Sequence, residues 1–101
     1  MLEIVIFVEE QPLFELGETV FTCGARNTLV RLNIDPAELI ARHVTGDWGD
    51  IPLEDQKTNQ RAVKNSGRVF SSYTLPPNDT KIYVITESDR SYTTILLPEE
   101  Y

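Results

Sequence analysis

Several residue types are nearly missing from this chain of 101 residues, which has one cysteine, one histidine, one tryptophan and one methionine. The single thiol, Cys23, excludes an internal disulfide bond and fits a reducing compartment. No uninterrupted apolar run approaches the ~18 residues that a membrane-spanning helix needs, and the first residues lack the signals of a secretory leader. We therefore expect one cytoplasmic domain over residues 1–101, with no membrane contact and no cofactor.

Basic side chains are also scarce, with nine Lys and Arg against sixteen Asp and Glu and a net charge of −7. Residues 1–25 contain five acids and no base, whereas residues 26–68 carry seven bases against six acids. An acidic chain repels nucleic acid overall, because affinity for phosphate comes mainly from Lys and Arg. The charge suits solubility, or the binding of a protein with a basic surface.

Hydrophobic patterning predicts an α+β fold of three short helices packed on one face of a three- to four-stranded antiparallel sheet. Apolar residues recur at helical spacing over 24–32 and 36–44, and the second segment begins with the capping sequence Asp35-Pro36-Ala37-Glu38. A third helix is predicted over 51–65, with acids in its first turn and a glycine stop at Gly67. Its apolar content is thin, so we expect it to pack by one edge and to expose the rest.

The second half of the chain has the alternating pattern of strands. Two five-residue connections separate three such segments and predict an antiparallel C-terminal meander, at 68–75, 81–86 and 92–97. Residues 82–85 have bulk on both faces and should lie in the central strand. A further β-branched run at 2–8 predicts an N-terminal strand within residues 1–12, which either adds a fourth strand or pairs with the segment around Val20.

The tryptophan lies in the loop Gly46-Asp47-Trp48-Gly49-Asp50. Two glycines let the backbone turn sharply, and two aspartates keep the loop solvated. An indole ring needs apolar contact and a partner for its N–H, so Trp48 either clamps the loop onto the domain or is presented to a partner. We favour the clamp, and we predict that Arg90 anchors the loop by pairing with Asp47 or Asp50.

Other short segments accompany this loop, namely Glu54-Asp55, Ser66-Gly67-Arg68, Ile85-Thr86-Glu87, Asp89-Arg90-Ser91 and Thr93-Thr94-Ile95-Leu96-Leu97-Pro98-Glu99-Glu100-Tyr101. Through them, residues 13–101 resemble a family of small bacterial, plasmid and phage proteins that are labelled hypothetical or plasmid-related; residues 1–12 are then an addition to the family core. The resemblance implies a mobile-element context, in which small acidic proteins that block host defence systems are common. It implies no catalytic residue, because the family has no assigned mechanism.

Four carboxylates surround the tryptophan, at Asp47, Asp50, Glu54 and Asp55, with His43 one helical turn before them. Their spacing does not match the alternate oxygen ligands of an EF-hand loop. Acids at a helix start are explained by capping and by the helix dipole. We therefore predict no metal site.

Few groups are available for catalysis. His43 shares its helix face with apolar residues, where a packed, hydrogen-bonded imidazole is the ordinary explanation. Cys23 begins a helix, which lowers a thiol pKa, but we expect a small buried hydrophobe there. Glu87 and Asp89 offer paired carboxylates of the kind that hydrolyse glycosides, and no aromatic-lined cleft accompanies them.

The positive surface that the sequence offers is a stripe along the third helix, formed by Lys57, Arg61, Lys64 and Arg68 at i, i+4, i+7 and i+11. Helices 24–32 and 36–44 also have the length and spacing of a helix-turn-helix pair. The second of them carries only Arg42 as an exposed base, which is too little for phosphate contacts.

The sequence therefore predicts a non-catalytic protein-binding accessory protein of a phage or plasmid, acting as a monomer or homodimer. Its most specific form is a stoichiometric inhibitor of a host defence system, of the anti-CRISPR or anti-restriction type. The alternatives are a nucleic-acid-binding regulator that uses the basic stripe and the helix pair 24–44, and a small enzyme centred on His43 or the carboxylate cluster. The candidate contacts to a basic protein partner are Trp48 and the acids Glu9, Glu10, Glu15, Glu18, Asp47, Asp50, Glu54, Asp55, Glu87 and Asp89.

Overall fold

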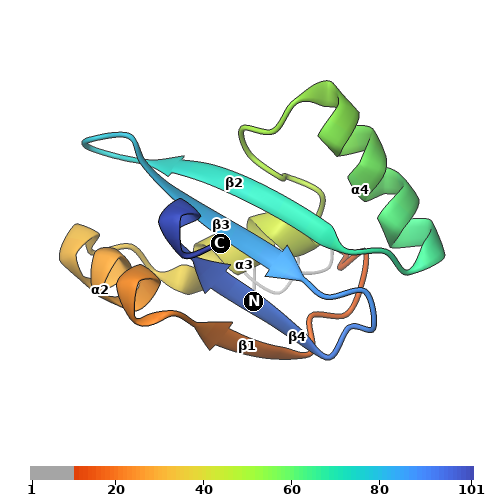
Figure 1. The fold of residues 1–101 in the computed structure, drawn as a ribbon, viewed down its shortest axis with the longest axis horizontal. Helices are drawn as coiled ribbons and strands as arrows, with labels where there is room; N and C mark the ends of the chain where they lie inside the picture. Colours follow the sequence, from red (N-terminus) through yellow and green to blue (C-terminus); the bar gives the residue numbers. More distant parts are fainter. Residues whose placement is uncertain (1–10) are drawn as a thin grey trace, which may run out of the picture.

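A computed structural model describes residues 11–101 (Figure 1). The strand predicted at 2–8 and the candidate contacts Glu9 and Glu10 lie outside these residues. The described elements are, in order, β1 (Glu18–Phe21), α2 (Cys23–Leu32), α3 (Pro36–Val44), α4 (Leu53–Asn65), β2 (Val69–Leu75), β3 (Thr80–Thr86), β4 (Tyr92–Leu96) and the 3₁₀ turn η1 (Pro98–Glu100). The predicted α+β class is confirmed, and the three helices begin and end within two residues of their predicted bounds.

The sheet has the strand order β1-β4-β3-β2. Strand β3 pairs antiparallel with β2 on one side and with β4 on the other, so the predicted meander is confirmed, with residues 82–85 in its central strand. The prediction of a fully antiparallel sheet is wrong at β1, which runs parallel to β4. Three helices and two strands separate β1 from its partner β4 along the chain, so no hairpin fixes the direction of β1.

The helix ends follow local capping chemistry. Asp35 accepts a hydrogen bond from the Ala37 N–H over 2.9 Å at the start of α3. At the end of α4, the left-handed residue is Ser66, with a φ of 59°, and not the predicted Gly67. Gly67 has a different role, because a Cβ there would lie 3.0 Å from the Ala62 side chain. It allows the chain to turn tightly against the helix it has just left.

The core lies between the sheet and helices α2 and α3, and α3 is seen behind the strands in Figure 1. Its buried members include Ala25 and Leu29 of α2 and Leu39 of α3, together with strand residues such as Tyr73 and Ile82. Helix α4 stands beside β2, whereas α2 lies near the opposite edge of the sheet (Figure 1). The prediction that the helices cover one face therefore holds for α2 and α3, which share one core cluster, but not for α4, which lies along the edge of the sheet; the C-terminal turn η1 lies over the near face of β3.

Candidate functional site

Trp48 is buried, with 7% of its surface exposed, and it packs in a second apolar cluster with Ile51, Ala62 and Val69. Its indole N–H donates a hydrogen bond to the backbone carbonyl of His43 over 3.1 Å. The ring therefore clamps the loop onto the end of α3 and onto α4. This confirms the clamp that the sequence favoured over a presented ring.

The backbone of the tryptophan loop covers the outer edge of β2. The Asp50 N–H donates to the Ser72 carbonyl over 2.7 Å, and the Ser72 N–H donates to the Trp48 carbonyl over 3.1 Å. Gly49 has a φ of 75°, and a Cβ at this position would collide with the Ser72 carbonyl. Because unpaired strand edges invite pairing with other chains, one role of the loop is to protect this edge.

Asp47 is held by Arg42. The Arg42 Nε and Nη2 donate to the two carboxylate oxygens over 2.7 and 3.3 Å, and the guanidinium lies 4.4 Å from the centre of the Tyr73 ring. This hydrogen bonding lowers the pKa of Asp47 below its ordinary value, whereas burial raises the pKa of Tyr73 to about 12. The Tyr73 hydroxyl donates to the Asp47 carbonyl over 2.7 Å. Asp47 is thus an ionised structural residue of the loop.

Arg90 is an anchor for a different element from the one predicted. Its guanidinium lies 5.3 Å from the centre of the Phe14 ring, and it donates to three backbone carbonyls, those of Ala62, Gly67 and Glu87. Carbonyls at a helix C-terminus lack intrahelical donors and attract cations. Arg90 therefore caps the end of α4. The predicted pairing with Asp47 or Asp50 is wrong, because the Asp47 carboxylate binds Arg42 and the Asp50 carboxylate binds Thr74.

His43 is fully buried, and both nitrogens of its ring have partners. Its Nδ1 lies 2.6 Å from the Ser71 hydroxyl and its Nε2 lies 2.9 Å from the Thr86 hydroxyl, which in turn lies 2.7 Å from the Thr93 hydroxyl. Burial, and then the charge of Arg90, lower the pKa of His43 to about 3. The neutral imidazole ties α3 to three strands, as the packed histidine predicted from the sequence would.

Cys23 is exposed, contrary to its predicted burial. The reason is the orientation of α2, whose buried side is formed by Ala25, Thr28 and Leu29. Within residues 11–101, no three His, Cys, Asp or Glu side chains gather closely enough to hold a metal ion. With His43 enclosed by hydroxyl groups, these positions do not favour the enzyme alternative.

The predicted acidic contacts fall into two groups. Four of them interact within the domain, namely Asp47 with Arg42, Asp50 with Thr74, Glu87 with Arg68 and Asp89 with Ser91. Four others are exposed, namely Glu15, Glu18, Glu54 and Asp55. Since β1 and α4 lie at opposite edges of the sheet (Figure 1), these last four acids are divided between two places.

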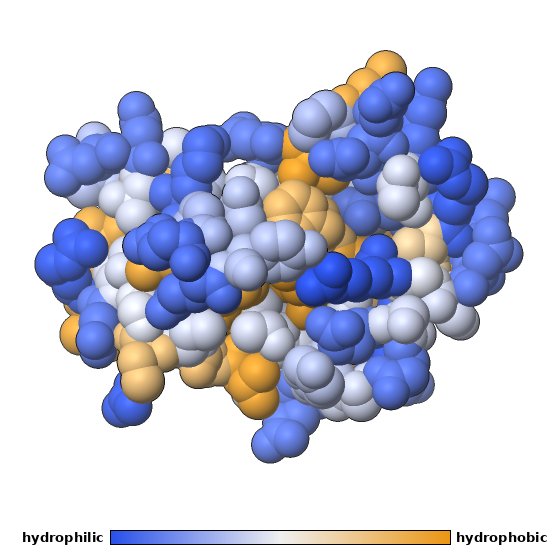
Figure 2. Space-filling model, in the orientation of Figure 1, coloured by the Kyte–Doolittle hydropathy of each residue, from blue (hydrophilic) through white to orange (hydrophobic). Residues whose placement is uncertain are grey.

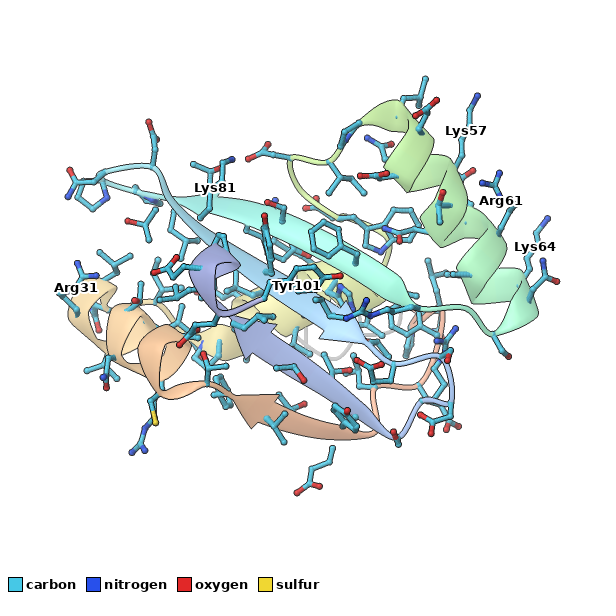
Figure 3. The ribbon with its side chains drawn as sticks, viewed as in Figure 1. Arg31, Lys57, Arg61, Lys64, Lys81 and Tyr101 are labelled. Atoms are coloured by element: carbon cyan, nitrogen blue, oxygen red, sulfur yellow. The ribbon has the colours of Figure 1, made fainter. Side chains whose placement is uncertain are left out.

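The predicted basic stripe is also divided. Lys57, Arg61 and Lys64 are exposed on α4 and point away from the sheet (Figure 3). Arg68 lies beyond the helix, and its guanidinium donates to the Tyr101 hydroxyl over 3.0 Å. The structure thus keeps three of the four bases on one surface.

A groove between β1, α2 and α3 is the feature that sequence reasoning missed. It has a volume of about 580 Å³, and its apolar lining comprises Phe21, Leu29, Val30, Ile34 and Pro36. Phe21 is 40% exposed and Val30 is 74% exposed. Arg26 lines it from α2, and Asp35 and Glu38 line it from the start of α3.

One sequence signal for this groove was present. Val30 falls outside the apolar face of its helix, which is formed by Ala25, Leu29 and Leu32. A β-branched apolar residue on the polar side of a short helix indicates a surface that packing within the chain does not cover.

No protein-family model, curated protein or solved structure matches this chain. None of the helices in residues 11–101 has the length and the hydropathy needed to cross a bilayer.

Proposed function

We propose that this chain is a non-catalytic binding protein whose partner is another protein. One observation carries the proposal, which is that Phe21 and Val30 remain exposed on either side of an apolar groove of about 580 Å³. Exposed apolar side chains around a hollow are typical of sites that bury an anchoring side chain of a partner.

The charges beside the groove indicate the chemistry of the partner. Asp35 and Glu38 lie together at the start of α3, and Arg26 lies across the groove on α2. A partner segment with an apolar side chain for the groove and a basic side chain for the two acids complements this surface. Such a segment agrees with the basic protein surface that the net charge of −7 favours.

The finer form of the proposal is a phage or plasmid accessory protein that inhibits a host defence complex stoichiometrically. It rests on the resemblance of the tryptophan loop and the C-terminal segment to plasmid and phage proteins. Binding of a basic partner at the groove is the physical act that such inhibition needs.

The helix-turn-helix form of the nucleic-acid alternative has less support. Helix α3 would be the recognition helix, yet its Arg42 is paired with Asp47. Its other side is buried beneath the sheet, through Leu39, His43 and Val44. A helix in this position has no free base to offer to phosphate.

Retention of proteins from a bacterial lysate on the immobilised chain tests the proposal. Val30→Lys and Asn27→Lys add the same charge to exposed positions of α2, but only Val30 lines the groove. We expect the Asn27→Lys variant to retain the same protein as the wild type, and the Val30→Lys variant to retain at least about tenfold less. Thermal melting checks that both variants fold. Equal retention by both variants would contradict the assignment of binding to the groove.

A further inference from the structure

A second surface, on α4, presents a row of cations. Lys57, Arg61 and Lys64 lie at i, i+4 and i+7, which places them on one helix face over about 10 Å of its axis. Each is exposed, and none forms an ion pair with an acid of residues 11–101. Figure 3 shows them pointing outward together, whereas Arg31 and Lys81 lie on other elements. In Figure 2, hydrophilic residues cover this right-hand edge of the molecule.

An apolar hollow adjoins the cations. It has a volume of about 290 Å³ and is lined by Leu13, Trp48, Gln60, Val63 and Lys64. A neighbouring hollow of about 310 Å³ is lined by Lys57, Gln60, Arg61 and Lys64. Gln60 and Lys64 belong to both, and Leu13 is 46% exposed. The cations and the apolar hollow therefore form one continuous surface, which we call the α4 face.

We infer that the α4 face docks an acid-rich amphipathic helix of a partner protein. Carboxylates at i, i+4 and i+7 of such a helix match the spacing of the three cations. An apolar side chain at the edge of its acidic stripe fills the hollow beside Trp48. This inference goes beyond the proposed function, because it assigns a second surface whose charge preference is opposite to that of the groove.

An extended polyanion such as duplex DNA complements the α4 face less well. Three phosphate contacts give weak and strongly salt-dependent binding, and the net charge of −7 opposes the approach of a duplex. Glu54 and Asp55 also lie in the first turn of α4, beside one end of the row. An acidic helix contacts the α4 face alone and gains the apolar contact that a phosphate backbone lacks.

Titration with a panel of synthetic helical peptides tests the inference. Every peptide carries Glu at i, i+4 and i+7, and the members differ in the presence and position of one Leu. Trp48 is the only tryptophan and lines the hollow, so its fluorescence reports the entry of that Leu. We expect one Leu-bearing peptide to bind, to shift the Trp48 emission and to bind more weakly as salt is added. Replacement of its Glu residues by Gln should weaken binding at least about tenfold.

Charge reversal on the protein supplies the matched comparison. Arg61→Glu should weaken binding of that peptide at least about tenfold. Arg31→Glu makes the same change on the exposed side of α2 and should weaken binding less than about twofold. Lys57→Glu serves as a second variant if melting shows that Arg61→Glu does not fold. The groove variant Val30→Lys should bind the peptide normally, which separates failure of this inference from failure of the proposed function.

Three results overturn the inference. One is that no peptide of the panel binds below about 1 mM. Another is that Arg31→Glu weakens binding as much as Arg61→Glu does. The third is that a DNA duplex binds more tightly than every peptide and loses affinity in the same α4 variants, which would assign the face to nucleic acid.

Discussion

Helices α3 and α4 are attached to the same sheet by different kinds of interaction. Helix α3 lies beneath the sheet and buries one whole side, formed by Leu39, His43 and Val44. Helix α4 buries only Asn59 and Ala62. The Asn59 amide donates to the Phe70 carbonyl over 2.8 Å and accepts from the Phe70 N–H over 3.1 Å. Helix α3 is held mainly by packing, whereas α4 combines these polar bonds along one edge with a small apolar contact to the Trp48 cluster.

This difference determines what each helix leaves free. Packing requires an apolar stripe, so the inner residues of α3 are committed to the core. Hydrogen bonds to backbone position α4 with few side chains, and the rest of its surface is open to other uses. The cations of the α4 face occupy that surface, at no cost to the attachment of the helix.

Acidification should loosen the attachment of α3. The folded state keeps His43 neutral and lowers its pKa from 6.5 to about 3, so the unfolded chain binds one more proton between these values. The stability that depends on neutral His43 is fully present above the ordinary pKa of 6.5. It is lost progressively as the pH falls toward the folded-state pKa of about 3. The free energy of unfolding should drop by about 2 kcal/mol at pH ~5 and by on the order of 4 kcal/mol near pH ~3. Urea unfolding at a series of pH values measures this slope.

The His43→Gln variant is the control for this slope. It should be less stable at every pH, because an amide group does not place two hydrogen-bonding atoms where the two ring nitrogens lie and leaves the Ser71 and Thr86 hydroxyls poorly paired. Its stability should not depend on pH between ~7 and ~5. The groups whose pKa is lowered by hydrogen bonds, Asp47, Asp89 and Glu100, have ordinary values of 3.8 or 4.5 and titrate below this range. A full slope in the variant would show that another group is responsible.

Removal of one side chain should loosen α4. Asn59→Ala leaves the Phe70 N–H and carbonyl without their partners, and it should lower the free energy of unfolding by about 2–3 kcal/mol. Gln56→Ala removes a single 3.4 Å bond to the carbonyl of Ile51, just before the same helix, and should cost less than about 1 kcal/mol. Equal losses in the two variants would mean that α4 is not held through Asn59.

The parts of the fold that the sequence predicted are those set by neighbouring residues. The cap at Asp35 and the hairpin connections of the meander act over a few positions, and they were recognised correctly, although the first connection has four residues and not the predicted five. The direction of β1 was predicted wrongly, because it depends on the path of the chain through three helices. The role of Ser66 was missed because two adjacent residues can both end a helix, and contact with Ala62 decides between them.

In the candidate site, too, features set by neighbouring residues could be predicted, and features that join distant segments could not. The burial of Trp48 followed from what an indole requires. The partner of Asp47 was within reach of sequence reasoning, because Arg42 lies five residues earlier at the end of a predicted helix. The groove joins residues of β1, α2 and α3, so only the exposed position of Val30 indicated it in advance.

A smaller effect is expected at the C-terminal end of α4, where Arg90→Ala removes the guanidinium that binds the Ala62 and Gly67 carbonyls. Alanine keeps the Cβ at a φ of 60°, so the backbone strain is unchanged and the loss reports the hydrogen bonds alone. We expect a loss of about 1–2 kcal/mol and faster amide hydrogen exchange at Gly67. Arg90→Lys should restore less than half of the stability, because an ammonium group cannot span several carbonyls as a guanidinium does. If amide exchange became faster at Gly49 but not at Gly67, the result would indicate that Arg90 stabilises the tryptophan loop and not the end of α4.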